Sequence, residues 1–216
     1  YDDGLGDEDN IKLVYFSPTF NGFRLAASYS PEDSTNGQYG GNAGDAAAGL
    51  QNNSSLALEY NNDFGDFSLR LMAGMEEYVL ERCNASAGTQ TCENKPTSTQ
   101  WGGQISFGKF AIGGGYLETE QITQTATGAT REREDWDLGV SYWSGQYGVG
   151  VQMGSAEIDQ VDGTQDSLDL MELNATYVLG PGIDVGMAVR KGEFDDATPG
   201  VTNDNDFTEF GISAAL

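Results

Sequence analysis

Side chains with catalytic or metal-binding chemistry are scarce in this sequence. There is no histidine, which removes the commonest general base and the commonest zinc ligand. A pair of carboxylates could still act as a base, but the composition argues against a hydrolase. The only cysteines, Cys83 and Cys92, lie close together in one polar stretch. Such a pair in an exposed loop favours a disulfide in an oxidising compartment over two free thiols or a metal site.

Carboxylates are the main charged groups, with 34 acidic against 10 basic residues and a formal net charge of −24. Such an acidic chain lacks the basic face that nucleic acids require, so we expect no nucleic-acid partner. Acids on the long Gly- and Asp-rich segments could hold Ca²⁺, which prefers oxygen ligands, or could be plain solvated charges. The candidates are Asp159, Asp162, Asp166, Asp195, Asp196, Asp204 and Asp206.

The elements that position these charges are strands, because short segments with a two-residue period recur along the whole chain. We expect a single domain over residues 1–216, with no linker. The expected strands are Ile11–Phe16, Phe23–Ser30, Ser55–Asn61, Phe67–Met75, Gln100–Phe107, Phe110–Leu117, Trp136–Tyr142, Tyr147–Met153, Asp169–Val178, Ile183–Val189 and Phe207–Leu216.

Short turns and long loops alternate between these strands. Gly108 and Lys109 alone join one pair, whereas the polar segment 31–53 follows another pair. Short turns at one end and long loops at the other are typical of outer-membrane barrels, whereas a soluble sandwich would mix loop lengths at both ends. We therefore predict an all-β fold, a transmembrane antiparallel β-barrel.

One face of most segments is apolar and the other is small or charged. In Trp136–Tyr142 the even positions are Trp, Leu, Val and Tyr, and the odd positions are Asp, Gly and Ser. A soluble sandwich would turn the apolar face inward. Mid-strand charges on the other face favour a water-filled interior, since a base facing lipid would cost about 2–4 kcal/mol at the midplane. These charges are Arg24, Glu59, Arg70, Asp137, Asp184 and Glu209.

Aromatic residues gather beside the short turns. Phe107 and Phe110 flank one turn, and Tyr142 and Tyr147 flank another. A soluble core has no reason to collect rings at one end, whereas a barrel places them at the membrane interface. The aromatic positions therefore favour the membrane barrel.

The segment Asp9–Phe23 resembles a stretch of the general Gram-negative trimeric porins. In that family an Asn precedes a strand that ends in Tyr-x-Ser-Pro, and the next turn ends in Gly-Phe. Here the Asn is Asn10, the strand ends at Tyr15–Pro18, and the turn also ends in Gly-Phe. The stretch Tyr177–Gly182 is similar to the same porins. The chain differs at its end, where Leu216 stands in place of the family's aromatic residue.

The resemblance implies a barrel of about sixteen strands, of which about eleven are represented here. Eleven strands could not close an antiparallel barrel, because the first and last would pair in parallel, so we expect N-terminal strands to be missing. Residues 1–10 would then end an internal loop that narrows the pore. The implied constriction has an acidic side of Asp2, Asp3 and Asp7 and a basic wall of Lys12, Arg24 and Arg70.

The function implied by the resemblance is passive diffusion of small hydrophilic solutes and ions through the outer membrane of a Gram-negative bacterium, with no cofactor required. Inward acids outnumber inward bases, so we expect a preference for cations that weakens with ionic strength. These acids are Glu59, Asp137, Asp184 and Glu209. A substrate-specific porin and a non-conducting adhesin or anchor barrel remain alternatives.

The resemblance also implies a homotrimer in outer-membrane lipid. The family's interface is formed mainly by strands near the two ends of the full chain. We therefore expect neighbouring subunits to bury Phe210 and Ile212, and lipid to contact Leu138 and Val149.

Overall fold

The computed structural model describes residues 12–32, 50–80, 97–122, 130–159, 163–196 and 205–215. The strands are β1 (Leu13–Phe16), β2 (Phe23–Glu32), β3 (Leu50–Asp63), β4 (Phe67–Leu80), β5 (Thr97–Phe107), β6 (Phe110–Ile122), β7 (Thr130–Ser144), β8 (Tyr147–Asp159), β9 (Gln165–Gly180), β10 (Ile183–Asp195) and β11 (Asn205–Ala215). No helix in the described segments has the length and apolarity needed to cross a membrane.

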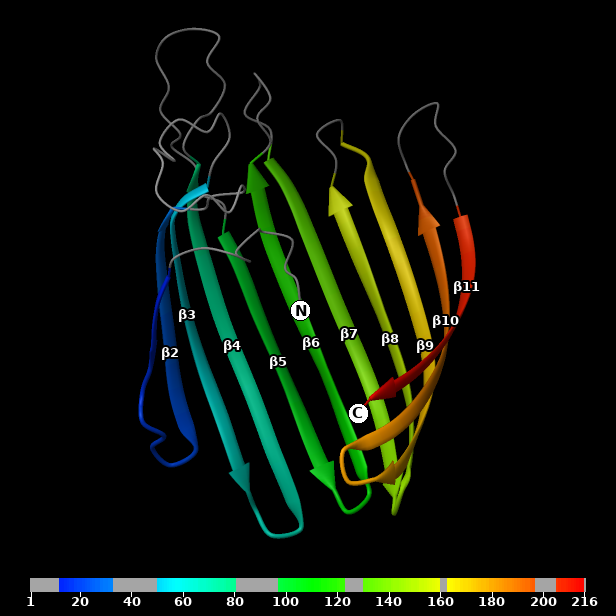
Figure 1. The fold of residues 1–216 in the computed structure, drawn as a ribbon. Helices are drawn as coiled ribbons and strands as arrows, with labels where there is room; N and C mark the ends of the chain where they lie inside the picture. Colours follow the sequence, from blue (N-terminus) through cyan, green and yellow to red (C-terminus); the bar gives the residue numbers. More distant parts are fainter. Residues whose placement is uncertain are drawn as a thin grey trace, which may run out of the picture.

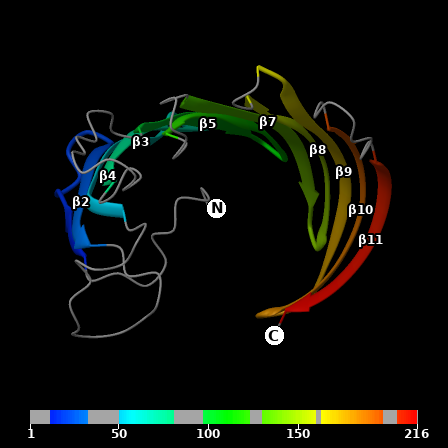
Figure 2. The ribbon, with the colours of Figure 1, turned by 90° about the horizontal axis from the view of Figure 1, so that it is seen from above.

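The eleven strands form one sheet in which each strand pairs with its neighbours in sequence, always antiparallel. Figure 1 shows them side by side, with the short turns at the lower end. Seen from above, the sheet bends into an open trough that runs from β1 and β2 at one rim to β11 at the other (Figure 2). The predicted all-β, antiparallel architecture is confirmed.

Two-residue turns set the lower ends of the central strands. Gly108 and Gly145 begin two of these turns with positive φ values of 56° and 63°, a conformation that primed hairpin turns require and that glycine adopts without strain. The amine of Lys109 donates to the hydroxyl oxygen of Ser144 at 2.9 Å, which links the two neighbouring turns. The predicted starts of β6 and β8 at these turns are confirmed.

The strands extend further toward the loops than predicted. β7 begins at Thr130 rather than Trp136, and β6 continues to Ile122 rather than Leu117. In this extension Glu118 pairs with Glu134, and Thr119 with Arg133. Hydrophobic alternation stops here because polar residues occupy both faces, although the backbone ladder continues. The alternating pattern therefore marks the apolar band of the sheet and not the full length of its strands.

The apolar face of the sheet has no second layer against it. Leu117, at 3% exposure, is the only buried hydrophobic residue in the part of the chain that the structure describes, whereas Met153 is 43% exposed and Met187 55%. A soluble sandwich would bury such side chains against a second sheet. An exposed convex surface of large apolar side chains is what contact with lipid requires, and the sandwich alternative is wrong.

A lower aromatic belt follows the short turns. The rings of Phe107 and Phe110 are 5.8 Å apart between centroids, and those of Phe110 and Tyr142 are 4.8 Å apart. The contacts continue on both sides, with Phe23 beside Tyr60 and Tyr147 beside Tyr177. The aromatic rings that were predicted to lie beside the short turns therefore contact one another across several strands.

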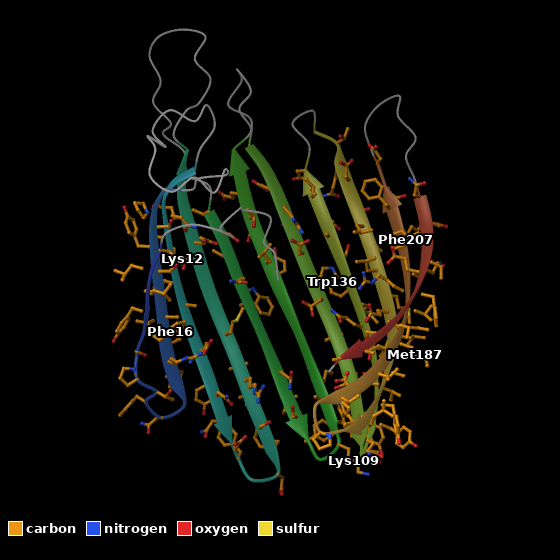
Figure 3. All side chains as sticks on the ribbon, viewed as in Figure 1. Lys12, Phe16, Lys109, Trp136, Met187 and Phe207 are labelled. Carbon is orange, nitrogen blue, oxygen red and sulfur yellow. The ribbon has the colours of Figure 1, made fainter. Side chains whose placement is uncertain are left out.

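A second belt, which the sequence pattern did not predict, crosses β5 to β7 nearer the loops. Trp101, Tyr116 and Trp136 are consecutive cross-strand partners, and the first two rings are 5.7 Å apart. Each ring lies six residues from a lower-belt ring on its own strand (101 and 107, 116 and 110, 136 and 142). That is about 20 Å along the strand, similar to the ~25 Å apolar band between the aromatic girdles of membrane barrels. Figure 3 labels Trp136 well above Lys109.

Candidate functional site on the concave wall

A cavity of about 740 Å³ lies against the concave, polar face of β3 to β9, inside the trough of Figure 2. Because alternate residues of a strand point to opposite faces, the side chains that enter the cavity come from every second position. The polar side chains in its lining are Glu59, Asn61, Arg70, Gln100, Gln104, Asp137, Ser141, Gln152 and Asn174. Such a wall can hydrogen-bond and orient a passing solute without covalent chemistry.

Glycines form the floor of this cavity. Gly102 pairs with Gly115, and Gly113 pairs with Gly139, so neighbouring strands present bare backbone to the cavity. On the convex side a Cβ on Gly114 would collide with the carbonyl oxygen of residue 137. Close approach is not confined to the convex side, since a Cβ on Gly113 would lie 2.9 Å from the carbonyl oxygen of residue 103. The glycines of β5 and β6 therefore allow close backbone approach on both faces and leave this part of the concave face without side chains.

Asp137 stands in the middle of the glycine floor. Its cross-strand partners are Gly115 on β6 and Gly154 on β8. A Cβ placed on Gly115 would lie 3.2 Å from Oδ1 of Asp137, so the carboxylate extends over that glycine. Among the described residues, Asp137 has neither an ion-pair nor a hydrogen-bond partner. It is thus a carboxylate without a nearby counter-charge on the cavity wall.

The β2–β3 flank of the wall is neutralised by an ion pair. Arg24 and Glu59 are direct cross-strand partners, with 2.6 Å between guanidinium Nη2 and carboxylate Oε2. The guanidinium also lies 5.3 Å from the ring centre of Phe16. The structure therefore brings Arg24 and Glu59 together, but they form an ion pair with each other.

Of the three bases predicted as one wall, Lys12 lies apart from Arg24. Arg70, on β4, lines the cavity and forms no ion pair with a described residue. Lys12 precedes β1 and lies toward the loop end (Figure 3). In the β1–β2 register, Phe16 pairs with Ala26 and Leu13 with Tyr29. Lys12 is therefore about 20 Å along the strand direction from Arg24.

The β9–β11 flank carries a cluster of charges that the sequence pattern missed in part. Nε and Nη2 of Arg190 donate to Oε2 of Glu172 at 3.1 and 2.8 Å, and Glu209 lies 3.9 Å from Nη1. The predicted strand stopped at Val189. Extending its alternation by one residue would have placed Arg190 on the face of Asp184.

The predicted inward acids lie in different surroundings. Glu59 and Glu209 each lie within ion-pair distance of an arginine. Asp137 lines the cavity without an ion-pair partner among the described residues. Asp184 is the second residue of β10, beside the short turn and opposite Val178 and Ala215, and does not line the cavity. The four acids therefore share a face but not a site.

Several predicted residues lie outside the described part of the chain, namely Asp2, Asp3, Asp7, Cys83, Cys92, Asp162 and Asp204. Asp159, Asp166, Asp195, Asp196 and Asp206 lie at strand ends near the loops. The amide of Gln165 donates to Oδ1 of Asp159 at 3.0 Å. Within the described ranges no three His, Cys, Asp or Glu residues are grouped so that they could hold a metal ion. Calcium binding therefore remains a prediction.

Comparison with known proteins agrees with this geometry. Residues 1–197 match the family described as Gram-negative porin. Among curated proteins there is no match to the chain.

Solved structures share the fold at low sequence identity. They include a loop-deletion mutant of OmpT, an outer membrane protein of Vibrio cholerae (14% identity, TM-score 0.64, 94% of this chain and 61% of that one). A porin structure has 18% identity and a TM-score of 0.62 over 100% of this chain and 64% of that one. An anion-selective porin from Comamonas acidovorans has 14% identity and a TM-score of 0.60 over 94% and 57%. The chain thus spans 57% to 64% of the length of these structures.

Proposed function

Because the chain belongs to the Gram-negative porin family of the outer membrane, we propose that the complete protein is a general diffusion porin. It passes small hydrophilic solutes and ions passively through a water-filled pore. The observation that carries this proposal is the contrast between the two faces of the sheet. The convex face exposes large apolar side chains, and the concave face holds a polar cavity with a glycine floor.

The proposed pore prefers cations. On the concave wall the guanidinium groups of Arg24 and Arg190 each have a carboxylate partner, whereas Asp137 has none among the described residues. Arg190 has two carboxylates near it, Glu172 and Glu209, and Asp184 adds another charge to the same face. The single charge of Arg70 therefore does not cancel the negative excess. The sign must come from such residues and not from the fold, since the similar porin from Comamonas acidovorans is described as anion-selective.

A planar-bilayer recording of the complete protein tests both parts of the proposal. Under a potassium chloride gradient we expect ohmic channels whose reversal potential indicates cation preference. The preference should shrink as ionic strength rises, because salt screens fixed charges. An anion preference would contradict the assigned sign, and the absence of conductance would favour a non-conducting adhesin or anchor barrel.

A substrate-specific porin is the second candidate, and the amide side chains around the cavity favour it. Gln100, Gln104 and Gln152 could hydrogen-bond a sugar or a small amide. Flux that saturates with the concentration of one solute would support this candidate. Flux proportional to concentration supports general diffusion.

We also propose that the complete protein is a homotrimer whose interface includes the last strand. Phe210 and Ile212 on β11 are 65% and 73% exposed in the single subunit, so they have a large apolar surface to bury. A photoactivatable cross-linker attached to a cysteine at position 210 should join neighbouring subunits, whereas the same label on a cysteine in place of Val149, which we expect to face lipid, should not. A monomer, or cross-linking through position 149 instead, would overturn this arrangement.

A further inference from the structure

We propose that Asp137 and the glycine floor around it form a weak binding site for the ammonium group of small dipolar solutes. This inference rests on the proposed pore, since the site must be reached through water on the concave side. It adds a named residue and a class of solute that general diffusion does not specify.

The charge of Asp137 is isolated from the bases on the concave face. The other concave acids that lie near arginines are partly neutralised, with Glu59 at 2.6 Å from Arg24 and Glu172 at 2.8 Å from Arg190. On the same strand Asp135 lies 2.7 Å from Arg133. Asp137, in contrast, has no ion-pair partner among the described residues, so its full charge can attract a solute.

The carboxylate of Asp137 also has open space around it. Asp137 pairs with Gly115 and Gly154 across the sheet, and Gly139 follows it on the same face of β7. None of these neighbours has a side chain that could cover the carboxylate. Since Oδ1 lies over Gly115, a cation can approach from the cavity and meet the oxygen directly.

The wall around Asp137 carries polar groups that complement a dipolar solute. Gln100, Gln104 and Gln152 supply amide donors and acceptors around the floor, and Arg70 supplies a positive charge toward β4. A solute that carries both an ammonium and a carboxylate would therefore orient with its ammonium at Asp137 and its carboxylate toward the arginine side. Exposure of the cavity to water keeps such binding weak, as a site on a diffusion path must be.

Liposome swelling with the complete protein tests the site. The probes are β-alanine, which is a zwitterion, and lactamide, its uncharged isomer, so the ratio of their swelling rates reports charge recognition at equal composition. Asp137→Asn should lower this ratio about threefold, which is the scale of one ion pair in contact with water. Asp184→Asn removes the same charge from the same face outside the cavity and should leave the ratio unchanged.

A second variant separates local geometry from net charge. Gly115→Ala keeps every charge but places a methyl group 3.2 Å from Oδ1 of Asp137, closer than an ordinary contact. The carboxylate must then shift, so the ratio should fall to a value between wild type and Asp137→Asn. Equal ratios in wild type, Asp137→Asn and Asp184→Asn would overturn the site while leaving the pore intact. If neither isomer caused swelling with the wild-type protein, the proposed pore would be wrong and the site with it.

Discussion

Gln152 and Met153 are neighbours on β8, yet they face two different environments. Gln152 lines the concave cavity, whereas Met153 is 43% exposed on the convex face, between Leu138 and Met171. Both side chains are accessible, so burial alone does not distinguish them. In this sheet, alternate residues therefore face water on one side and lipid on the other. The two-residue period does not distinguish a core from a surface, as it would in a soluble protein.

The largest effect should come from placing the same charge on either side of this boundary. Met153→Arg puts a guanidinium on the lipid face and should destabilise the folded barrel by about 2–4 kcal/mol if the site is near the midplane. Gln152→Arg places the same group in the water-filled cavity and should change stability little. Urea titration of both variants in lipid vesicles measures the contrast. Equal losses would mean that the convex face does not contact lipid.

A smaller effect should distinguish glycines that the backbone requires from those that it does not. Gly114→Ala would bring a methyl group into contact with the carbonyl oxygen of residue 137, and relief of such an overlap costs about 1–3 kcal/mol. Gly211→Ala is the matched control, because apart from its two chain neighbours no described residue has an atom within 4 Å of a Cβ at that position. The urea midpoint should fall for the first variant only, and a similar fall in both would argue against close backbone approach at β6.

On the concave face, loss of one carboxylate should alter selectivity more than stability. Glu59→Gln leaves Arg24 without its 2.6 Å partner, so the reversal potential should shift toward anions. The stability change should stay within about 0–1 kcal/mol, because exposed ion pairs contribute little. The double variant Arg24→Gln with Glu59→Gln should restore the selectivity, whereas a double variant that kept the full shift of Glu59→Gln would mean that the charge of Arg24 does not act on the pore.

The smallest effect on the barrel is expected in the loop that holds Cys83 and Cys92, outside the described residues. We predict an intraloop disulfide there, whose reduction should leave the urea midpoint unchanged, because strand pairing stabilises the barrel. Mass spectrometry should detect alkylation of both thiols only after reduction. Alkylation without a reductant would disprove the disulfide.

The sequence predicted the number and order of the strands and their turn ends, because tight turns impose local rules on residues such as Gly108 and Gly145. It did not predict the loop ends, since β6 and β7 continue with polar residues on both faces. The pair between Arg24 and Glu59 also could not be predicted, because the long segment between β2 and β3 leaves their register undetermined. Arg190 was not predicted as a residue of the concave face, because the predicted strand ended at Val189 whereas β10 continues to Asp195.

Pairing of every described strand with its sequence neighbour also has a consequence for folding. Each ladder can form as a hairpin from residues close in the chain, so the loop-closure entropy lost at each step is small. The sheet can therefore grow one hairpin at a time, from whichever hairpin forms first. Closure of such a sheet into a barrel is then the step that brings together the most distant parts of the chain, and we expect that step to be the slow one.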